Sequence, residues 1–204
     1  MKQDGSSMQQ QVLEVAIRRF SHFGISKTTL SEIADDLSIT KQSLAYYFHD
    51  KQSLIEAAEE LISGEYREAL ESRIQKAVSV EKALLEFSSV KNMFLERYYM
   101  MANDAENIEN ASGKSLYNWR DKIRLIDNKI LTGLFETGVA TGELKPLDPV
   151  KTSELFLDTL YAFSRCIRHT GGLPDMKTIK EVFAKQQEVI KIFYQGLKSE
   201  TWKA

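Results

Sequence analysis

The chain has 204 residues and a formal net charge of −2, and its apolar and charged fractions, 43% and 27%, are those of an ordinary soluble protein. Its single cysteine, Cys166, excludes a disulfide framework and a cysteine-ligated metal cluster. We interpret it as a small buried apolar side chain. The polar amino terminus lacks the apolar segment of a secretory leader, and no apolar run is long enough to span a membrane. We therefore expect a cytoplasmic protein of one large or two small domains.

The first expected helix runs from about Ser7 to Phe23, because apolar residues recur there at intervals of three and four. Gly24, directly after it, is typical of the residue at which a helix ends. The apolar stripe and its expected partners from the next two helices would form a three-helix core. These residues are Val12, Leu13, Ala16, Ile17, Phe20, Phe23, Ile33, Leu37, Leu44 and Phe48.

Two short helices separated by about three residues come next, which is the spacing of a helix-turn-helix motif. Thr29 and Glu32 form a capping box, in which each side chain bonds a free backbone N–H at the helix start. Ser38 ends this helix, and Thr40 is the expected N-cap of the next, which runs to Phe48. The pattern predicts one helix placed to enter a DNA groove.

The second short helix carries side chains suited to reading the major groove. A recognition helix contacts base edges with its amino-terminal part. There, Lys41 can bond guanine or a phosphate, Gln42 can pair with adenine, and Ala45 can touch a thymine methyl group. Tyr46 and Tyr47 each combine an apolar ring with a hydroxyl that can reach a phosphate.

A third feature of this region is the start of a long helix at Lys51, with Asp50 as its expected cap. The free N–H groups of the first turn attract anions. With the Lys51 ammonium beside them, they form an anion site suited to a DNA phosphate.

The stretch from Val12 to Leu54, about the first quarter of the chain, resembles the amino-terminal DNA-binding domain of TetR/AcrR-type transcriptional regulators. The resemblance is carried by the pattern F-G-x-x-x-T-T-L-x-x-I-A-x-x-L-x-I-T-K-x-S-L-x-Y-Y-F-x-x-K-x-x-L. It implies phosphate contacts from Thr29, Thr40, Tyr47 and Lys51, and it places Lys41, Gln42, Ser43, Ala45 and Tyr46 in or beside the groove. The family often has glycine at Ser38, a small residue at Gln42 and an aromatic at Ala45, so its base preferences do not carry over.

Residues 1–54 carry six basic and six acidic side chains, so any DNA affinity must come from where the charges lie. Lys27, Lys41 and Lys51 flank the proposed groove face. We expect few phosphate contacts per protomer and a strong dependence on dimerisation. The neutral balance keeps an alternative open, an all-helical ligand-binding or adaptor module whose helix-turn-helix no longer reads DNA.

The rest of the chain shows helical periodicity and no alternating strand pattern, which predicts an all-α fold of about nine helices. We divide the whole chain into a helix-turn-helix domain over residues 1–52 and a helical effector-binding and dimerisation domain over residues 53–204. Asn103 to Asn107 is a predicted polar interruption, and Gly171 to Pro174 a predicted break. The later helices are expected over residues 51–78, 80–102, 115–141 and 149–170, and a final helix is expected from Asp175 or Thr178 to about Lys198.

The last two long helices have broader apolar faces than one protomer's core requires. The surplus suits four-helix packing against a second copy, and the resemblance also implies a homodimer built through these helices. The alternative is that both faces are purely internal. The predicted interface residues are Phe156, Leu160, Phe163, Phe183, Val189, Ile190 and Phe193.

Aromatic and methionine side chains gather in the middle of the chain. Such residues line adaptable apolar cavities and also ordinary cores. The resemblance implies an effector pocket in this region, and hence a largely apolar small-molecule effector. The predicted lining residues are Phe94, Tyr98, Met101, Trp119, Phe135 and Tyr161. Arg97 could meet a ligand carboxylate or lie on a solvated face.

The chain shows no residue set for catalysis. His22, His49 and His169 lack metal-ligand spacing, and no nucleophile stands in a pattern with a base. We predict a ligand-responsive repressor that is no enzyme and needs no cofactor. As a homodimer it would place two recognition helices in successive major grooves of a near-palindromic double-stranded operator. The effector would shift the population between binding and non-binding dimers.

Overall fold

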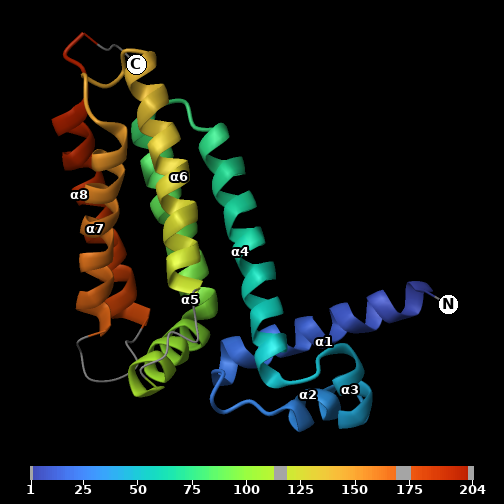
Figure 1. Ribbon diagram of the computed structural model, residues 1–204. Coiled ribbons are helices and arrows are strands. Elements are labelled where there is room, and N and C mark those ends of the chain that lie inside the picture. The colour runs from blue at the N-terminus through green and yellow to red at the C-terminus, as the bar shows by residue number, and fades with distance from the viewer. Residues whose placement is uncertain (1, 113–118, 169–175, 202–204) are drawn as a thin grey trace. The chain divides into compact units, whose positions relative to one another are not determined.

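The computed structural model describes residues 2–112, 119–168 and 176–201, which form eight α-helices (Figure 1). They are α1 (Lys2–Phe23), α2 (Leu30–Asp36), α3 (Lys41–Tyr47), α4 (Lys51–Gln75), α5 (Val80–Ser112), α6 (Trp119–Ala140), α7 (Pro149–Arg168) and α8 (Met176–Leu197). No strand occurs in these ranges, apart from an isolated bridge between Leu144 and Lys198. The predicted all-α class is confirmed, with eight helices where about nine were expected. No described helix combines the length and apolar character needed to cross a lipid bilayer.

The chain divides into two compact units. The first unit comprises residues 1–65 and 93–120, and the second comprises residues 66–92 and 121–204. Because α4 and α5 each contribute residues to both units, this division does not coincide with the functional boundary predicted between residues 52 and 53.

The core of the first unit includes the predicted three-helix cluster. Helices α1, α2 and α3 gather around the start of α4 (Figure 1). The fully or nearly fully buried side chains are Val12, Ala16, Phe20, Ile33, Leu44 and Phe48. Phe23 departs from the prediction, because it lies half-exposed at the end of α1, with the Arg19 guanidinium over its ring. Burial of the α2 and α3 apolar faces leaves their other faces in solvent.

Two residues with positive φ end the first two helices. Gly24 (φ 87°) follows α1, as predicted. Ser38 (φ 54°) follows α2, and the amides of Ser38 and Ile39 donate to the carbonyls of Asp35 and Ala34. This is the Schellman arrangement, in which a left-handed residue turns the chain and satisfies carbonyls at the helix end. It sets the tight turn between α2 and α3.

Helix α5 corrects the expected interruption at Asn103 to Asn107. The helix continues through those residues to Ser112, and its one non-helical residue is Tyr98 (φ −114°, ψ 19°). The stretch contains no glycine or proline, so its polar character alone does not end the helix. Helix α1 likewise begins at Lys2, earlier than the predicted Ser7. The predicted helix start at Ser115, the end of the helix over 149–170 and the break at Gly171 to Pro174 lie outside the described residues.

In the second unit, the buried residue Glu143, which follows α6, hydrogen-bonds several segments of the chain. Its Oε1 accepts hydrogen bonds from the Val80 amide at the start of α5 (2.8 Å) and from the Tyr194 hydroxyl on α8 (2.9 Å). The Glu143 carbonyl also accepts from the amide of Ser199. One residue therefore joins three segments that are far apart in the sequence.

Candidate nucleic-acid interface

Helix α3 separates its side chains into a buried face and an exposed face. Leu44 is fully buried and Phe48, directly after the helix, is nearly so. Tyr46 is 85% exposed, and its ring packs edge-on against that of the half-buried Tyr47 at 5.2 Å between centroids. The remaining exposed side chains of the helix are Lys41, Gln42, Ser43 and Ala45. The structure thus brings the predicted groove-reading residues onto one solvent-facing surface.

The predicted caps of both short helices are present. The Thr29 hydroxyl accepts a hydrogen bond from the Glu32 amide (3.3 Å), and the Glu32 carboxylate accepts from the Thr29 amide (2.7 Å) and hydroxyl (2.8 Å). These bonds lower the pKa of Glu32. The Thr40 hydroxyl accepts from the amide of Ser43 (3.0 Å) and lies 2.9 Å from its hydroxyl. The caps fix the helix starts beside the exposed face of α3.

The start of α4 has the predicted cap and an additional contact. Asp50 accepts a hydrogen bond from the Ser53 amide (2.8 Å), which lowers the pKa of the Asp50 carboxyl. The Lys51 ammonium donates to the carbonyl of Ile25 (2.6 Å), in the loop after α1. Partial burial lowers the pKa of Lys51, against the attraction of Asp104 and Glu32. Lys51 therefore ties the helix start to this loop, and one carbonyl uses one of its three donors.

Arg19 pairs with acidic side chains of α2. Its guanidinium bonds both carboxylate oxygens of Asp36 (2.6 and 2.8 Å) and lies 3.5 Å from Glu32. One cation is thus shared by two carboxylates of α2, which leaves one negative charge there, while the ammonium groups of Lys27 and Lys41 pair with no carboxylate of the described residues.

A contact that the sequence did not predict holds the loop after α1. The Asp104 carboxylate on α5 accepts a hydrogen bond from the Ser26 amide (2.9 Å). It passes so close to Gly24 that a Cβ there would lie 2.3 Å from Asp104 Oδ2. Together with Lys51, Asp104 fixes the loop that precedes the helix-turn-helix. These residues are 78 positions apart, so only the folded chain reveals the contact.

The six residues predicted to line an effector pocket are divided between the two units. Phe94, Tyr98, Met101 and Trp119 belong to the first, and Phe135 and Tyr161 to the second. The Trp119 indole donates to Ser63 (3.2 Å), the Tyr98 hydroxyl donates to Glu65 (3.4 Å), and Phe135 packs against Phe156. Arg97 is exposed beside the Tyr98 ring. The predicted pocket therefore stays a prediction.

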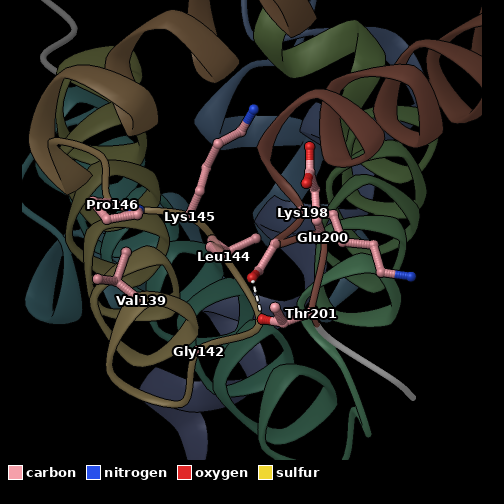
Figure 2. A pocket seen from close by; sticks show the side chains of 9 residues that line it. Val139, Gly142, Leu144, Lys145, Pro146, Lys198, Glu200 and Thr201 are labelled. Atoms are coloured by element: carbon pink, nitrogen blue, oxygen red, sulfur yellow. Dashed lines mark hydrogen bonds between the residues drawn. The ribbon is translucent and has the colours of Figure 1, made fainter.

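One cavity of about 440 Å³ lies in the second unit, between the α6–α7 connection and the segment after α8 (Figure 2). Its lining is Val139, Gly142, Leu144, Lys145, Pro146, Lys198, Ser199, Glu200 and Thr201. None of the predicted effector residues is among them.

Burial corrects part of the predicted dimer surface on α7 and α8. Phe156, Leu160 and Ile190 are buried within the protomer, so they cannot offer contact area to a second copy. Phe163, Phe183, Val189 and Phe193 are half-buried. Two apolar side chains outside the predicted set are strongly exposed, Leu155 on α7 (60% exposed) and Ile192 on α8 (71% exposed). The predicted interface stays a prediction.

The all-helical fold presents α3 as the exposed second helix of a helix-turn-helix. Residues 12–58 match the family model described as "Bacterial regulatory proteins, tetR family". The amino-terminal part of the chain is thus similar to TetR/AcrR-type transcriptional regulators.

Two curated relatives and one solved structure show how far the likeness extends. The transcriptional regulator AcrR of Shigella flexneri is 38% identical over 60 residues, which cover 29% of this chain and 28% of AcrR. RutR of Escherichia coli K12 is 29% identical over 147 residues, 71% of this chain and 68% of RutR. A transcriptional regulator from Cytophaga hutchinsonii shares the fold, with a TM-score of 0.82, 18% identity and coverage of 93% and 98% of the two chains. These relatives are regulators and not enzymes, and the chain spans just over a quarter of AcrR.

Proposed function

We propose that this chain is a homodimeric repressor that binds a near-palindromic operator through α3 of each protomer. The observation that carries the proposal is the division of α3 into a buried Leu44 and an exposed face bearing Lys41, Gln42 and Tyr46. Bases are read by exposed donors and acceptors near the start of such a helix. The capped, packed geometry of α2 and α3 supports a face that keeps its shape on binding.

Phosphate contacts would hold this face in register on the duplex. We assign them to Tyr47, at the end of α3, and to Thr29, Thr40 and Lys51, which lie outside this helix. The hydroxyls of Thr29 and Thr40 are engaged in caps, and each retains acceptor or donor capacity for a further partner. The positive end of the α4 dipole lies beside Lys51 and favours an anion.

The proposed homodimer brings α7 and α8 of two copies together. Leu155 and Ile192 supply exposed apolar surface on these helices, and the half-buried Phe163, Phe183, Val189 and Phe193 supply its margins. An isologous pairing would place the same residues on both sides of the interface. It would hold two α3 helices about 34 Å apart, or slightly more, as successive major grooves require.

We further propose that a small molecule bound by the helical domain over residues 53–204 changes DNA affinity. A ligand with different affinities for the two dimer arrangements shifts their populations. Such a regulator acts in the compartment that holds the chromosome, which we take to be the cytoplasm.

The test compares operator binding by wild type, Lys41→Ala and Tyr47→Ala, using the inverted repeat that the protein selects from random duplexes. If Lys41 contacts a base, we expect Lys41→Ala to weaken the free energy of operator binding by about 1–3 kcal/mol. If Lys41 contacts a phosphate, the slope of log K against log salt concentration should become shallower by about one. Lys82→Ala, an exposed lysine of α5, is the matched control. Circular dichroism confirms that each variant is folded. Unchanged affinity in both α3 variants would remove the proposed recognition face.

The neutral charge of residues 1–54 favours one second candidate, a helical ligand-binding or adaptor module that does not read DNA. The same salt titration separates the two. For a DNA reader, the logarithm of the binding constant falls with the logarithm of salt concentration, with a slope of about −0.9 per neutralised phosphate. Its preference for the inverted repeat is kept. A protein with no preference for any sequence at low or moderate salt would be the module.

A further inference from the structure

The interior of the second unit contains a polar cluster built by α4, α5, α6 and α7. At its centre Asp127 is fully buried. It accepts hydrogen bonds from the hydroxyls of Tyr66 (2.6 Å) and Tyr161 (3.3 Å), and it forms an ion pair with the ammonium of Lys91. Three donors from three helices therefore converge on one carboxylate, and both of its oxygens are occupied.

The Lys91 ammonium also lies among aromatic rings. Its Nζ is 4.8 Å from the ring centroid of Tyr161, 5.8 Å from that of Tyr66 and 6.0 Å from that of Phe87. Burial by itself would lower the pKa of Lys91, but the Asp127 carboxylate and the Tyr161 hydroxyl outweigh it and the pKa is raised. The place that such a cage offers to a cation is already filled by the protein's own ammonium.

Arg124 extends the cluster toward solvent. Its guanidinium lies 5.3 Å from the ring centroid of Tyr161, so that ring is shared by two cations. The carboxylate partner of Arg124 is Asp158 (2.8 Å), whose side chain is 63% exposed, while that of Arg124 is 38% exposed. An ion pair this exposed is weak and is easily exchanged for another carboxylate.

The hydrogen-bonding capacity that this cluster retains for a ligand lies in its N–H donors. Asp127 already accepts three hydrogen bonds. Lys91 has three N–H groups, of which two bond Asp127 and the Tyr161 hydroxyl, and Arg124 has five, of which one bonds Asp158. Arg124 offers the planar fork that binds carboxylates in a bidentate manner. The nearby apolar surface is the half-buried aromatic ring of Tyr161, since Phe87 is fully buried. A complementary ligand combines an apolar body with an anionic acceptor.

We propose that the effector is an apolar carboxylic acid whose carboxylate replaces Asp158 on Arg124 and reaches the Lys91 ammonium beside the Tyr161 ring. This inference rests on the proposed function in treating the ligand as an effector. It refines the expectation of a largely apolar effector by assigning it one negative charge. It also links helices α5, α6 and α7 through the ligand.

The test measures binding of paired probes to the full chain by isothermal titration calorimetry. The probes are straight-chain carboxylates from butyrate to dodecanoate, and benzoate, phenylacetate and 4-phenylbutyrate, each beside its primary amide. We expect at least one acid to bind about tenfold or more tightly than its amide, because charge-assisted hydrogen bonds to two cations are lost in the amide. Acids that bind no better than their amides, or no acid binding at all, would overturn the inference.

Variants localise the site. Arg124→Gln should weaken acid binding about tenfold or more. Arg73→Gln alters another exposed arginine–carboxylate pair of the same unit, that with Glu86, and should leave acid binding unchanged. Lys91→Met combined with Asp127→Asn removes both buried charges together, so no unpaired charge is left, and it should also abolish acid binding. Wild-type affinity in Arg124→Gln would overturn the assignment.

Operator binding is measured separately on the same preparations. Loss of the acid preference with intact operator binding rejects the effector site alone. Acid binding by a chain that selects no operator leaves the site standing and rejects the proposed function.

Discussion

Gly24→Ala should destabilise the chain through two separable effects. A left-handed residue with a Cβ costs about 1–2 kcal/mol, and Gly24 has φ 87°. The new Cβ would also lie 2.3 Å from Asp104 Oδ2, a distance that real contacts do not reach, so the carboxylate must move. Moving it breaks the bond to the Ser26 amide, worth about 1–2 kcal/mol after allowance for its exposure. The expected total is about 2–4 kcal/mol.

A double-mutant cycle with Asp104→Ala isolates the second effect. Asp104→Ala alone should cost about 1–2 kcal/mol, since it removes the same hydrogen bond. In that background Gly24→Ala should cost only the backbone strain, about 1–2 kcal/mol. The two changes together should therefore cost about as much as Gly24→Ala alone.

Urea unfolding followed by helical circular dichroism, at one fixed protein concentration, measures the four free energies of unfolding. The matched control pairs Gly24→Ala with Asp35→Ala, an exposed carboxylate on α2, and should be additive. Additive costs for Gly24 and Asp104 would show that the carboxylate does not approach this loop, and would refute the reasoning.

Three further changes have defined outcomes. Ser38→Gly should raise the free energy of unfolding, measured in urea, by about 0.5 kcal/mol, because relief of the left-handed strain exceeds the entropy cost of glycine. A loss of stability would contradict the φ of 54° at Ser38. Burial, with the Asp127 carboxylate, raises the pKa of Tyr66 above its usual 10. Unfolded Tyr66 therefore ionises first, stability falls as pH rises past about 10, and Tyr66→Phe should flatten that fall in pH-dependent urea titrations. Leu155→Glu with Ile192→Glu should shift the light-scattering mass toward the monomer, whereas Leu125→Glu, an equally exposed leucine on α6, should not.

Features whose partners lie within a few residues could be predicted from the sequence. The caps at Thr29, Thr40 and Asp50 each bond an amide three positions on, so the local pattern specifies them. Gly24 was predictable for the same reason, because a helix end is a local event. The exposed face of α3 followed from the spacing of Leu44 and Phe48.

Long-range contacts could not be predicted in this way. The non-helical residue inside α5 is Tyr98, a residue type that does not by itself break helices. Its hydroxyl donates a hydrogen bond to Glu65 on α4. The cluster around Asp127 joins residues up to 61 positions away, and no local pattern marks a charged pair as buried. Periodicity on α7 and α8 showed that apolar faces exist. It did not show which residues the protomer itself covers.

The most direct test of operator reading is selection of random duplex DNA on the purified full chain, with Lys41→Ala selected in parallel. We expect wild type to recover an inverted repeat, with half-sites about one helical turn apart, that survives moderate salt. The variant should recover a weaker or altered repeat. Recovery of no repeat by wild-type protein, or of the same repeat with equal enrichment by Lys41→Ala, would contradict DNA reading by α3.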